Sequence, residues 1–130
     1  MFLRKLSFLA IGLLSVALFI SVSSAVSKSG FTLTQIGDSD TSSAYKVTTS
    51  PKIVLELKTP DAKAELGISL LKRALISYKL QTRGDTWING RSVITSVYPD
   101  YEDGSYKTTV VMNDTMDNKT VSGQYYITNK

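Results

Sequence analysis

The chain has 130 residues, a formal net charge of +4, and neither cysteine nor histidine. Without cysteine it can form no disulfide, thiolate nucleophile or cysteine-ligated metal site, and without histidine it has neither a Ser-His-Asp triad nor a histidine-ligated zinc site. Most mechanisms of small enzymes are thereby excluded, and we predict a protein without catalytic residues, bound metal or cofactor.

The N-terminal segment has the pattern of a secretory signal peptide. Arg4 and Lys5 precede an apolar run from Leu6 to Val22, and the small residues 23–25 follow it. A basic start, an apolar centre and a small-residue cleavage site together direct a chain to export. We therefore predict that residues 1–25 are a cleaved signal peptide; the alternative is that they are retained as a membrane anchor.

Cleavage would leave residues 26–130 as a single small domain. Removing 25 of the 130 residues, Arg4 and Lys5 among them, leaves 105 residues with 13 basic and 11 acidic side chains. This size suits one domain. An exported domain of this size without disulfides is more typical of bacteria than of eukaryotes, so we expect a periplasmic or secreted protein of a bacterial envelope.

Three strands are predicted in the first part of this domain. Residues 31–36, 44–49 and 52–58 contain alternating apolar and polar residues and are separated by turn-forming residues. The segment 52–58 is the clearest of them, because its aliphatic residues fall on one face and its charged residues mostly on the other. Such a strand buries one face and leaves the other in water.

The next segment, residues 60–80, is predicted to be one long helix. Thr59 is a suitable N-cap, and Pro60 suits the first helical position because its missing N–H needs no partner there. Gly67 disfavours this helix by about 1 kcal/mol relative to alanine. Apolar residues nevertheless recur at helical spacing, in a stripe formed by Ala64, Ile68, Leu71, Leu75 and Tyr78.

Four further strands are predicted to follow as a β-meander. The first ends at Asn89-Gly90, a dipeptide that favours a type I′ turn because both central residues of that turn need positive φ. The others span residues 91–98, 105–112 and 120–128. The predicted order β-β-β-α-β-β-β-β corresponds to an α+β fold, in which one long helix packs on a mostly antiparallel sheet.

The aromatic residues of the C-terminal part indicate a binding function. Exposed tryptophan and tyrosine rings on a sheet make amphipathic platforms, so we predict an exported binding or accessory protein whose partner is another envelope or extracellular protein, or a glycan. Residues 72–91 hold five basic and one acidic side chain, and residues 100–118 hold five acidic and one basic, which can steer a charged partner. The predicted binding residues are Trp87, Tyr98, Tyr101, Tyr106 and Tyr126, with Arg83 and Arg91 at their rim.

Two other functions are compatible with the sequence. A structural subunit of a surface assembly could join its neighbour through a strand edge, for which residues 120–128 are the candidate. A small hydrolase could use a pair of carboxylates, and the acidic loops at 38–40 and 100–103 could ligate calcium. Nucleic acid is not expected, because the exported domain has a small net charge, and membrane contact is expected only through a retained N-terminal segment.

Overall fold

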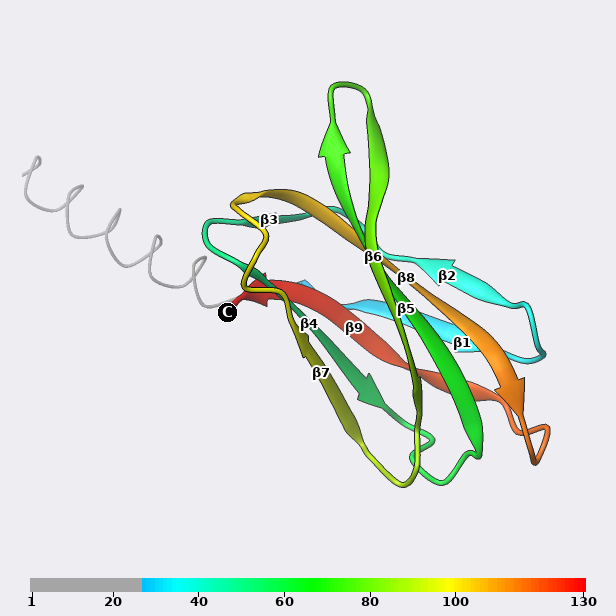
Figure 1. The fold of residues 1–130 in the computed structure, drawn as a ribbon. Coiled ribbons are helices and arrows are strands. Elements are labelled where there is room, and N and C mark those ends of the chain that lie inside the picture. Colours follow the sequence, from blue (N-terminus) through cyan, green and yellow to red (C-terminus); the bar gives the residue numbers. More distant parts are fainter. Residues whose placement is uncertain (1–26) are drawn as a thin grey trace, which may run out of the picture.

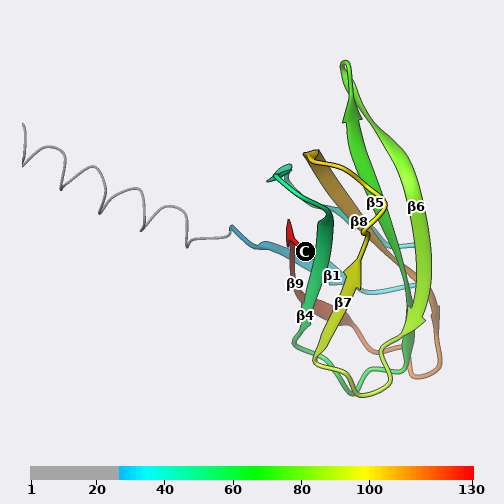
Figure 2. The same cartoon turned by 60° about the vertical axis from the view of Figure 1, so that its left-hand side comes forward.

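Residues 27–130 are described by a computed structural model, in which two antiparallel sheets pack face to face as a β-sandwich (Figures 1 and 2). The predicted signal peptide lies outside the described residues. The nine strands are β1 (Ser29–Leu33), β2 (Ser39–Thr41), β3 (Tyr45–Val47), β4 (Pro51–Leu57), β5 (Ala64–Ala74), β6 (Ser77–Trp87), β7 (Val93–Val97), β8 (Gly104–Thr115) and β9 (Val121–Asn129). The described part of the chain is therefore all-β, and the predicted α+β fold with one long helix is wrong. No helix of residues 27–130 has the length and apolar character needed to cross a membrane.

The chain crosses repeatedly between the two sheets. The first sheet has the order β1-β9-β4-β7 and the second the order β2-β8-β5-β6, with β3 also pairing with β8. Within the described residues, β5 and β6 are the only strands that are both consecutive and paired. The predicted meander is wrong, because β7 lies beside β4, β8 lies beside β5, and β9 lies between β1 and β4.

The core lies between the two sheets and is filled from both. Side chains alternate along each strand, so β5 contributes Leu66, Ile68 and Leu70 to the core while β9 contributes Tyr125. The rings of Phe31 and Tyr125 meet edge to face, with centroids 5.2 Å apart and an interplanar angle of 82°. Burial of these two apolar faces against each other is the main stabilising contribution in a sandwich.

Residues 60–80 form a turn, β5 and the beginning of β6 instead of the predicted helix. The helical stripe would have buried Leu75, which is 96% exposed. The apolar run fits a period of two as well as a helical period, and pairing with β6 on one side and β8 on the other favours the strand. The side chains that β5 buries follow the period of two: Ala64, Leu66, Ile68 and Leu70.

The segment Thr59-Pro60 begins a β-turn and not a helix. The N–H of Ala62 donates to the carbonyl oxygen of Thr59 at 3.1 Å. Pro60 thus occupies the second position of the turn, which favours its fixed φ as strongly as the first position of a helix does. The same residue types signal both structures, which explains why this helix start was predicted.

The predicted turn at Asn89-Gly90 is confirmed. Both residues have positive φ, 51° and 78°, and the N–H of Arg91 donates to the carbonyl oxygen of Ile88 at 3.0 Å. The turn connects β6 of the second sheet to β7 of the first. The turn therefore connects the two sheets at one end of the sandwich and does not form a hairpin within one sheet.

The last strand does not offer a free edge. Residues 120–128 were predicted as a strand, and β9 matches them, but β9 is paired with β1 on one side and β4 on the other. The strands at the sheet edges are β1 and β7 in the first sheet, and β6 and the pair β2 and β3 in the second. Joining a neighbour through residues 120–128 is therefore not possible in this sandwich.

Candidate functional site

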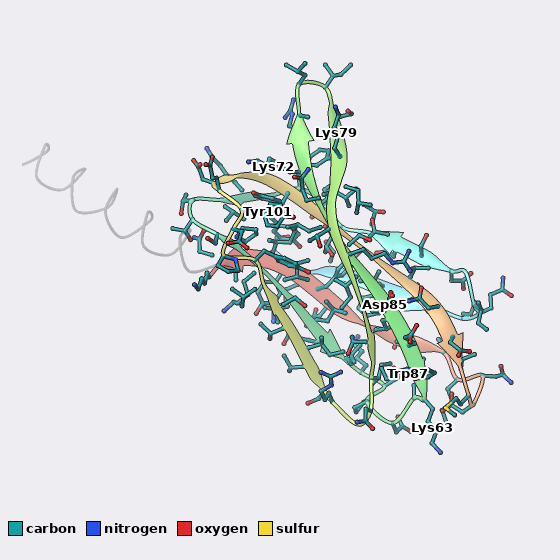
Figure 3. All side chains as sticks on the ribbon, viewed as in Figure 1. Lys63, Lys72, Lys79, Asp85, Trp87 and Tyr101 are labelled. Atoms are coloured by element: carbon teal, nitrogen blue, oxygen red, sulfur yellow. The ribbon has the colours of Figure 1, made fainter. Side chains whose placement is uncertain are left out.

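The predicted aromatic binding residues do not form one surface. Figure 3 shows Trp87 and Tyr101 at opposite ends of the sandwich. Tyr98 and Tyr101 are half-buried against the core as an edge-to-face pair with centroids 6.2 Å apart. Tyr126 is also half-buried, with the Nζ of Lys28 5.5 Å from its ring centroid.

Tyr106 is a core residue. Its side chain is completely buried, and its hydroxyl donates to the carbonyl oxygen of Glu102 at 2.5 Å. The ring fills the space between the sheets instead of facing a partner. Burial raises the pKa of this phenol above its usual value.

The two predicted arginines lie in different surroundings. Arg91 wraps around the turn beside Trp87: its Nη2 donates to the Trp87 carbonyl oxygen and to Thr86 Oγ1, each at 2.6 Å. Arg83 lies on the outer face of the second sheet, where its Nη2 donates to Asn113 Oδ1 at 2.6 Å. Arg91 therefore supports the Trp87 end of the molecule, whereas Arg83 does not.

The side chain of Arg83 explains Gly67. A Cβ at position 67 would lie 2.6 Å from Arg83 Nη2, so glycine leaves the room in which the guanidinium reaches Asn113. The amide of Asn113 in turn donates to Asp85 at 2.8 Å and to Glu65 at 3.3 Å. The amide of Asn113 thus bridges the carboxylates of Glu65 and Asp85 on the outer face of the second sheet. Neither carboxylate lines the two hollows described below.

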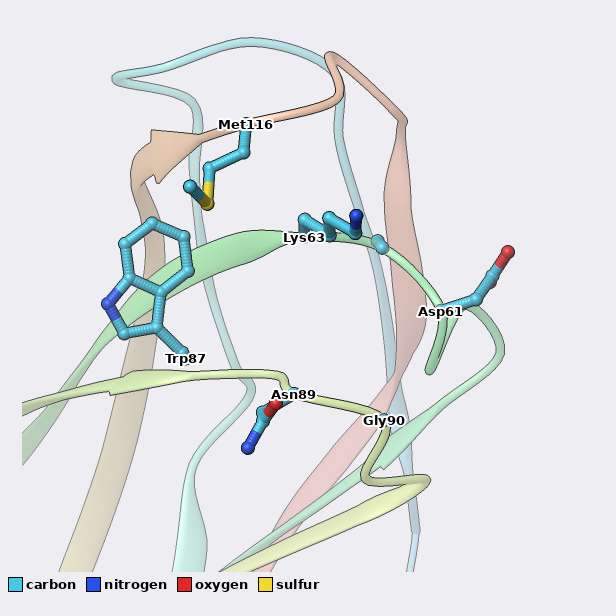
Figure 4. Close-up of a pocket in the computed structure, with 7 residues that line it drawn as sticks. Asp61, Lys63, Trp87, Asn89, Gly90 and Met116 are labelled. Atoms are coloured by element: carbon cyan, nitrogen blue, oxygen red, sulfur yellow. The ribbon is translucent and has the colours of Figure 1, made fainter.

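The exposed ring of Trp87 lies in a hollow of about 560 Å³ at one end of the sandwich (Figure 4). Three connections meet there: the turn before β5, the Asn89-Gly90 turn after β6, and the residues after β8. Trp87 is 37% exposed and Met116 is 75% exposed, and the thioether of Met116 points toward the indole. The lining residues are Asp61, Ala62, Lys63, Trp87, Asn89, Gly90 and Met116.

Hydrogen bonds hold these connections together. The N–H of Met116 donates to the carbonyl oxygen of Lys63 at 2.8 Å, and the N–H of Lys63 donates to Asp117 Oδ2 at 2.9 Å. Asp61 forms an ion pair with Lys119 at 3.0 Å. These bonds hold the pKa of both Asp61 and Asp117 below the usual range. The rim of the hollow is thus preformed and carries charges of both signs.

Sequence reasoning found Trp87 but missed the rest of this hollow. Asp61 and Lys63 belong to the predicted helix, and Met116 lies between the predicted strands 105–112 and 120–128 with no predicted role. The one local signal is the Asn-Gly turn two residues after the tryptophan, which predicts that Trp87 lies at the end of a strand. The sequence around Met116 contains no pattern that indicates its position beside Trp87.

A second hollow of about 370 Å³ lies over β1 and β9. Its polar lining includes Asp40, whose carboxylate accepts a hydrogen bond from the hydroxyl of Tyr125. Asp38 accepts bonds from the N–H and the hydroxyl of Thr34, both at 2.8 Å, which lowers the pKa of its carboxyl. Among residues 27–130 no three acidic side chains gather as a metal site would require. The carboxylates of the 38–40 loop are instead used in structural hydrogen bonds.

Stability should fall at alkaline pH because of Tyr125. Burial and the hydrogen bond to Asp40 raise the pKa of this phenol well above its usual value. The neutral form is therefore favoured in the folded state, so the stabilisation is fully present below about pH 10 and is lost as the pH rises above it. The urea midpoint of wild-type protein should decline between about pH 9 and 11, and Tyr125→Phe should make that decline shallower.

Burial also raises the pKa of Tyr98 and Tyr106, so the Tyr125→Phe variant should keep part of the alkaline dependence. A decline as steep in Tyr125→Phe as in the wild type would contradict the role assigned to this hydroxyl.

Comparison with known proteins supports the fold and gives no function. No protein-family model matches the chain, and no curated protein matches its sequence. A crystal structure of the protein GEBA250068378 from Sulfurospirillum deleyianum is similar, with a TM-score of 0.51 and 10% sequence identity, over 79% of this chain and 98% of that one. At this identity the similarity concerns the arrangement of strands alone.

Proposed function

We propose that this protein is a small exported binding protein that holds another envelope or extracellular protein at the hollow beside Trp87. The observation that carries the proposal is the tryptophan ring, which lies in a hollow with a preformed rim and with Met116 beside it. Trp87 and Met116 together place apolar surface outside the core, and an apolar patch surrounded by polar groups is typical of an interaction site.

The chemistry of the hollow supports a protein partner. Tryptophan is among the residues that contribute most to protein interfaces when a partner covers it. Methionine adapts to irregular apolar surfaces because its side chain is unbranched and polarisable. The polar groups of Asp61, Lys63 and Asn89 surround this apolar centre, as in an interface with an apolar core and a polar rim.

The positions of the carboxylates favour binding over hydrolysis. Asp61 pairs with Lys119, Asp117 accepts backbone N–H groups, and Asp40 accepts the Tyr125 hydroxyl. Each of these acids has a structural hydrogen-bond partner. The bridged pair Glu65 and Asp85 lies on a sheet face, whereas glycoside chemistry needs two carboxyls on opposite sides of a cleft.

The edge of β6 is partly protected against pairing with a neighbour. Side chains donate to three of its carbonyl groups: Tyr101 to Gln81 at 3.2 Å, Gln81 to Lys79 at 3.0 Å, and Arg91 to Trp87 at 2.6 Å. Covering an edge in this way is a common means of preventing strand-to-strand association. It supports a discrete binding protein over a subunit that assembles through its sheets.

Substitution of Trp87 should strongly weaken capture of the partner. Immobilised residues 26–130 would be exposed to an envelope and culture-fluid extract of the source organism, and bound proteins identified by mass spectrometry. Trp87→Ala should weaken binding of the captured protein about 30-fold or more, as expected for a central interface residue. Val97→Ala is the control, because Val97 is similarly exposed, at 42%, but lies on β7.

Three results would overturn the proposal. Equal recovery by Trp87→Ala and Val97→Ala would exclude the hollow as the binding site. Recovery of the bait's own chain alone would indicate self-assembly. Loss of capture after enzymatic removal of glycans from the extract would indicate that a sugar, and not a protein surface, occupies the hollow.

A further inference from the structure

The hairpin of β5 and β6 projects beyond the rest of the sandwich (Figure 1), and the residues at its tip are apolar. β5 is paired with β8 only as far as Lys72, so residues 73–78 have no strand beside them except within the hairpin. At the tip, Leu75 is 96% exposed and Ile76 is 97% exposed. The tip therefore lies entirely outside the core.

The turn is built from residues that a turn does not favour. Leu75 has a φ of 39°, in the left-handed region that glycine and asparagine prefer. The cross-strand pair Ala74 and Ser77 leaves Leu75 and Ile76 as a two-residue turn, for which Asn-Gly is the usual sequence. Backbone strain of this kind is typical of sites with a function, because it costs stability without improving the fold.

Positive charge surrounds the base of this tip (Figure 3). Lys72 and Lys79 are directly opposite each other in the register, and Arg73 is adjacent. Like charges in direct opposition are unfavourable in a sheet, and none of the three forms an ion pair with another of residues 27–130. Residues 66–84 contain no acidic residue at all. The hairpin therefore carries three basic side chains, Lys72, Arg73 and Lys79, just below its apolar tip.

The hairpin is anchored firmly at its base. The hydroxyl of Tyr78 is hydrogen-bonded to Ser105 at 2.8 Å, and Lys107 Nζ lies 4.5 Å from the centroid of the Tyr78 ring. Tyr101, which precedes the acidic residues Glu102 and Asp103, donates to Gln81 and lies farther from the tip than Lys72 and Lys79. Lys72 points back toward this loop, because its Nζ lies 5.7 Å from the centroid of the Tyr106 ring, whose hydroxyl donates to the carbonyl oxygen of Glu102. The acidic loop therefore lies beside the base of the hairpin and behind its tip (Figure 1).

We infer that this hairpin docks on an anionic lipid surface, with Leu75 and Ile76 inserted and Lys72, Arg73 and Lys79 against the lipid phosphates. Lys72 lies three positions before Leu75 in the chain, a length of about 10 Å along a strand, and interfacial apolar groups enter a bilayer by about 5–10 Å. Anionic lipid also neutralises the opposed lysines. A convex tip of two side chains is too small for a stable protein interface, whereas a bilayer requires no matching shape. This inference extends the expected membrane contact beyond the N-terminal segment.

Vesicle binding by residues 27–130 tests this inference. Every strand and core residue described above lies within this range, and the apolar run at 6–22 is absent from it. Sedimentation with vesicles of phosphatidylglycerol and phosphatidylcholine should capture the wild type, and vesicles of phosphatidylcholine alone should bind it at least about tenfold more weakly. The double variant Leu75→Ser, Ile76→Ser should lose at least about tenfold in affinity for the anionic vesicles.

Matched controls separate insertion from charge and from misfolding. Val93→Ser with Val97→Ser changes two exposed apolar residues on β7 and should leave vesicle binding unchanged. Lys72→Gln, Arg73→Gln and Lys79→Gln together should remove the difference between anionic and neutral vesicles. Ile76→Trp should show a blue shift of its added fluorescence on anionic vesicles, while Trp87, at the other end of the molecule (Figure 3), should not change in the wild type.

Two results would overturn the inference. Wild-type protein that does not sediment with anionic vesicles, or that sediments equally well without the apolar tip, would exclude insertion. A dimer in analytical ultracentrifugation that becomes a monomer in Leu75→Ser, Ile76→Ser would assign the tip to contact with a second copy of the chain. The outcome is independent of the Trp87 hollow, which none of the tip substitutions touches.

Discussion

The Gly123→Ala variant should be at least about 3 kcal/mol less stable than the wild-type protein. Gly123 lies near the start of β9, where β9 is paired with both β1 and β4. A Cβ at this position would lie 2.3 Å from the carbonyl oxygen of Glu56 and 3.1 Å from the Cα of Leu57. Both atoms belong to the backbone of β4, so a change of rotamer cannot relieve the contact.

Urea unfolding of Gly123→Ala and Gly84→Ala measures this effect against a matched control. Gly84 lies on the exposed strand β6, and a Cβ there would have no heavy atom within 4 Å. Gly84→Ala should therefore change the free energy of unfolding by no more than about 0.5 kcal/mol. Gly123→Ala should lower the urea midpoint, and in a thermal melt it should lower the melting temperature by about 10–20 °C. Equal midpoints for the two variants would contradict the close approach of β4 and β9.

Leu66→Ala should destabilise the protein by about 2–5 kcal/mol, and Leu75→Ala should have almost no effect on stability. Leu66 is completely buried on β5, and its removal leaves a cavity between the sheets. Leu75 is 96% exposed and has no core contact to lose. Both residues belong to the segment that its periodicity predicts to be helical, so the pair tests the fold directly.

The measurement is the free energy of unfolding of each variant, with circular dichroism of the wild type as a check of its strand content. In a helix with the predicted stripe, Leu75 would be buried and Leu66 would lie away from the centre of the stripe. A larger loss in Leu75→Ala than in Leu66→Ala would therefore contradict the sandwich and support the helix.

Much of the strand pattern could be predicted from the sequence, because local chemistry determines it. The alternation in residues 52–58 and 120–128 corresponds to β4 and β9, and Asn89-Gly90 forms the turn that its two positive φ angles require. Residues 60–80 were misassigned because Thr59-Pro60 begins a turn as well as a helix. Gly67 argues against the predicted helix, because a helix does not require glycine at this position. In the sheet, the absence of a side chain at Gly67 leaves room for the guanidinium of Arg83.

The candidate site could be predicted only in part, because long-range packing determines it. Trp87 is exposed as expected, whereas Tyr106 belongs to the core and Tyr98 and Tyr101 pack against it. All four are aromatic residues in or next to strands, and the sequence contains nothing that separates an inward ring from an outward one without the register. The partner of Trp87 in the hollow, Met116, comes from a connection that only the closed sandwich brings near.

The position of β9 has a consequence for how the protein is made. Strand β9 lies between β1 and β4, so the first sheet stays incomplete until residues 121–129 are available. Hairpin β5–β6 is local and can form early, but most strand pairs join distant parts of the chain and close slowly. A chain that is emerging from a ribosome cannot fold fully before β9 has emerged. In the export that we propose, this delay would keep the strands before β9 from completing the first sheet, and would therefore keep them able to be translocated, until β9 has been synthesised.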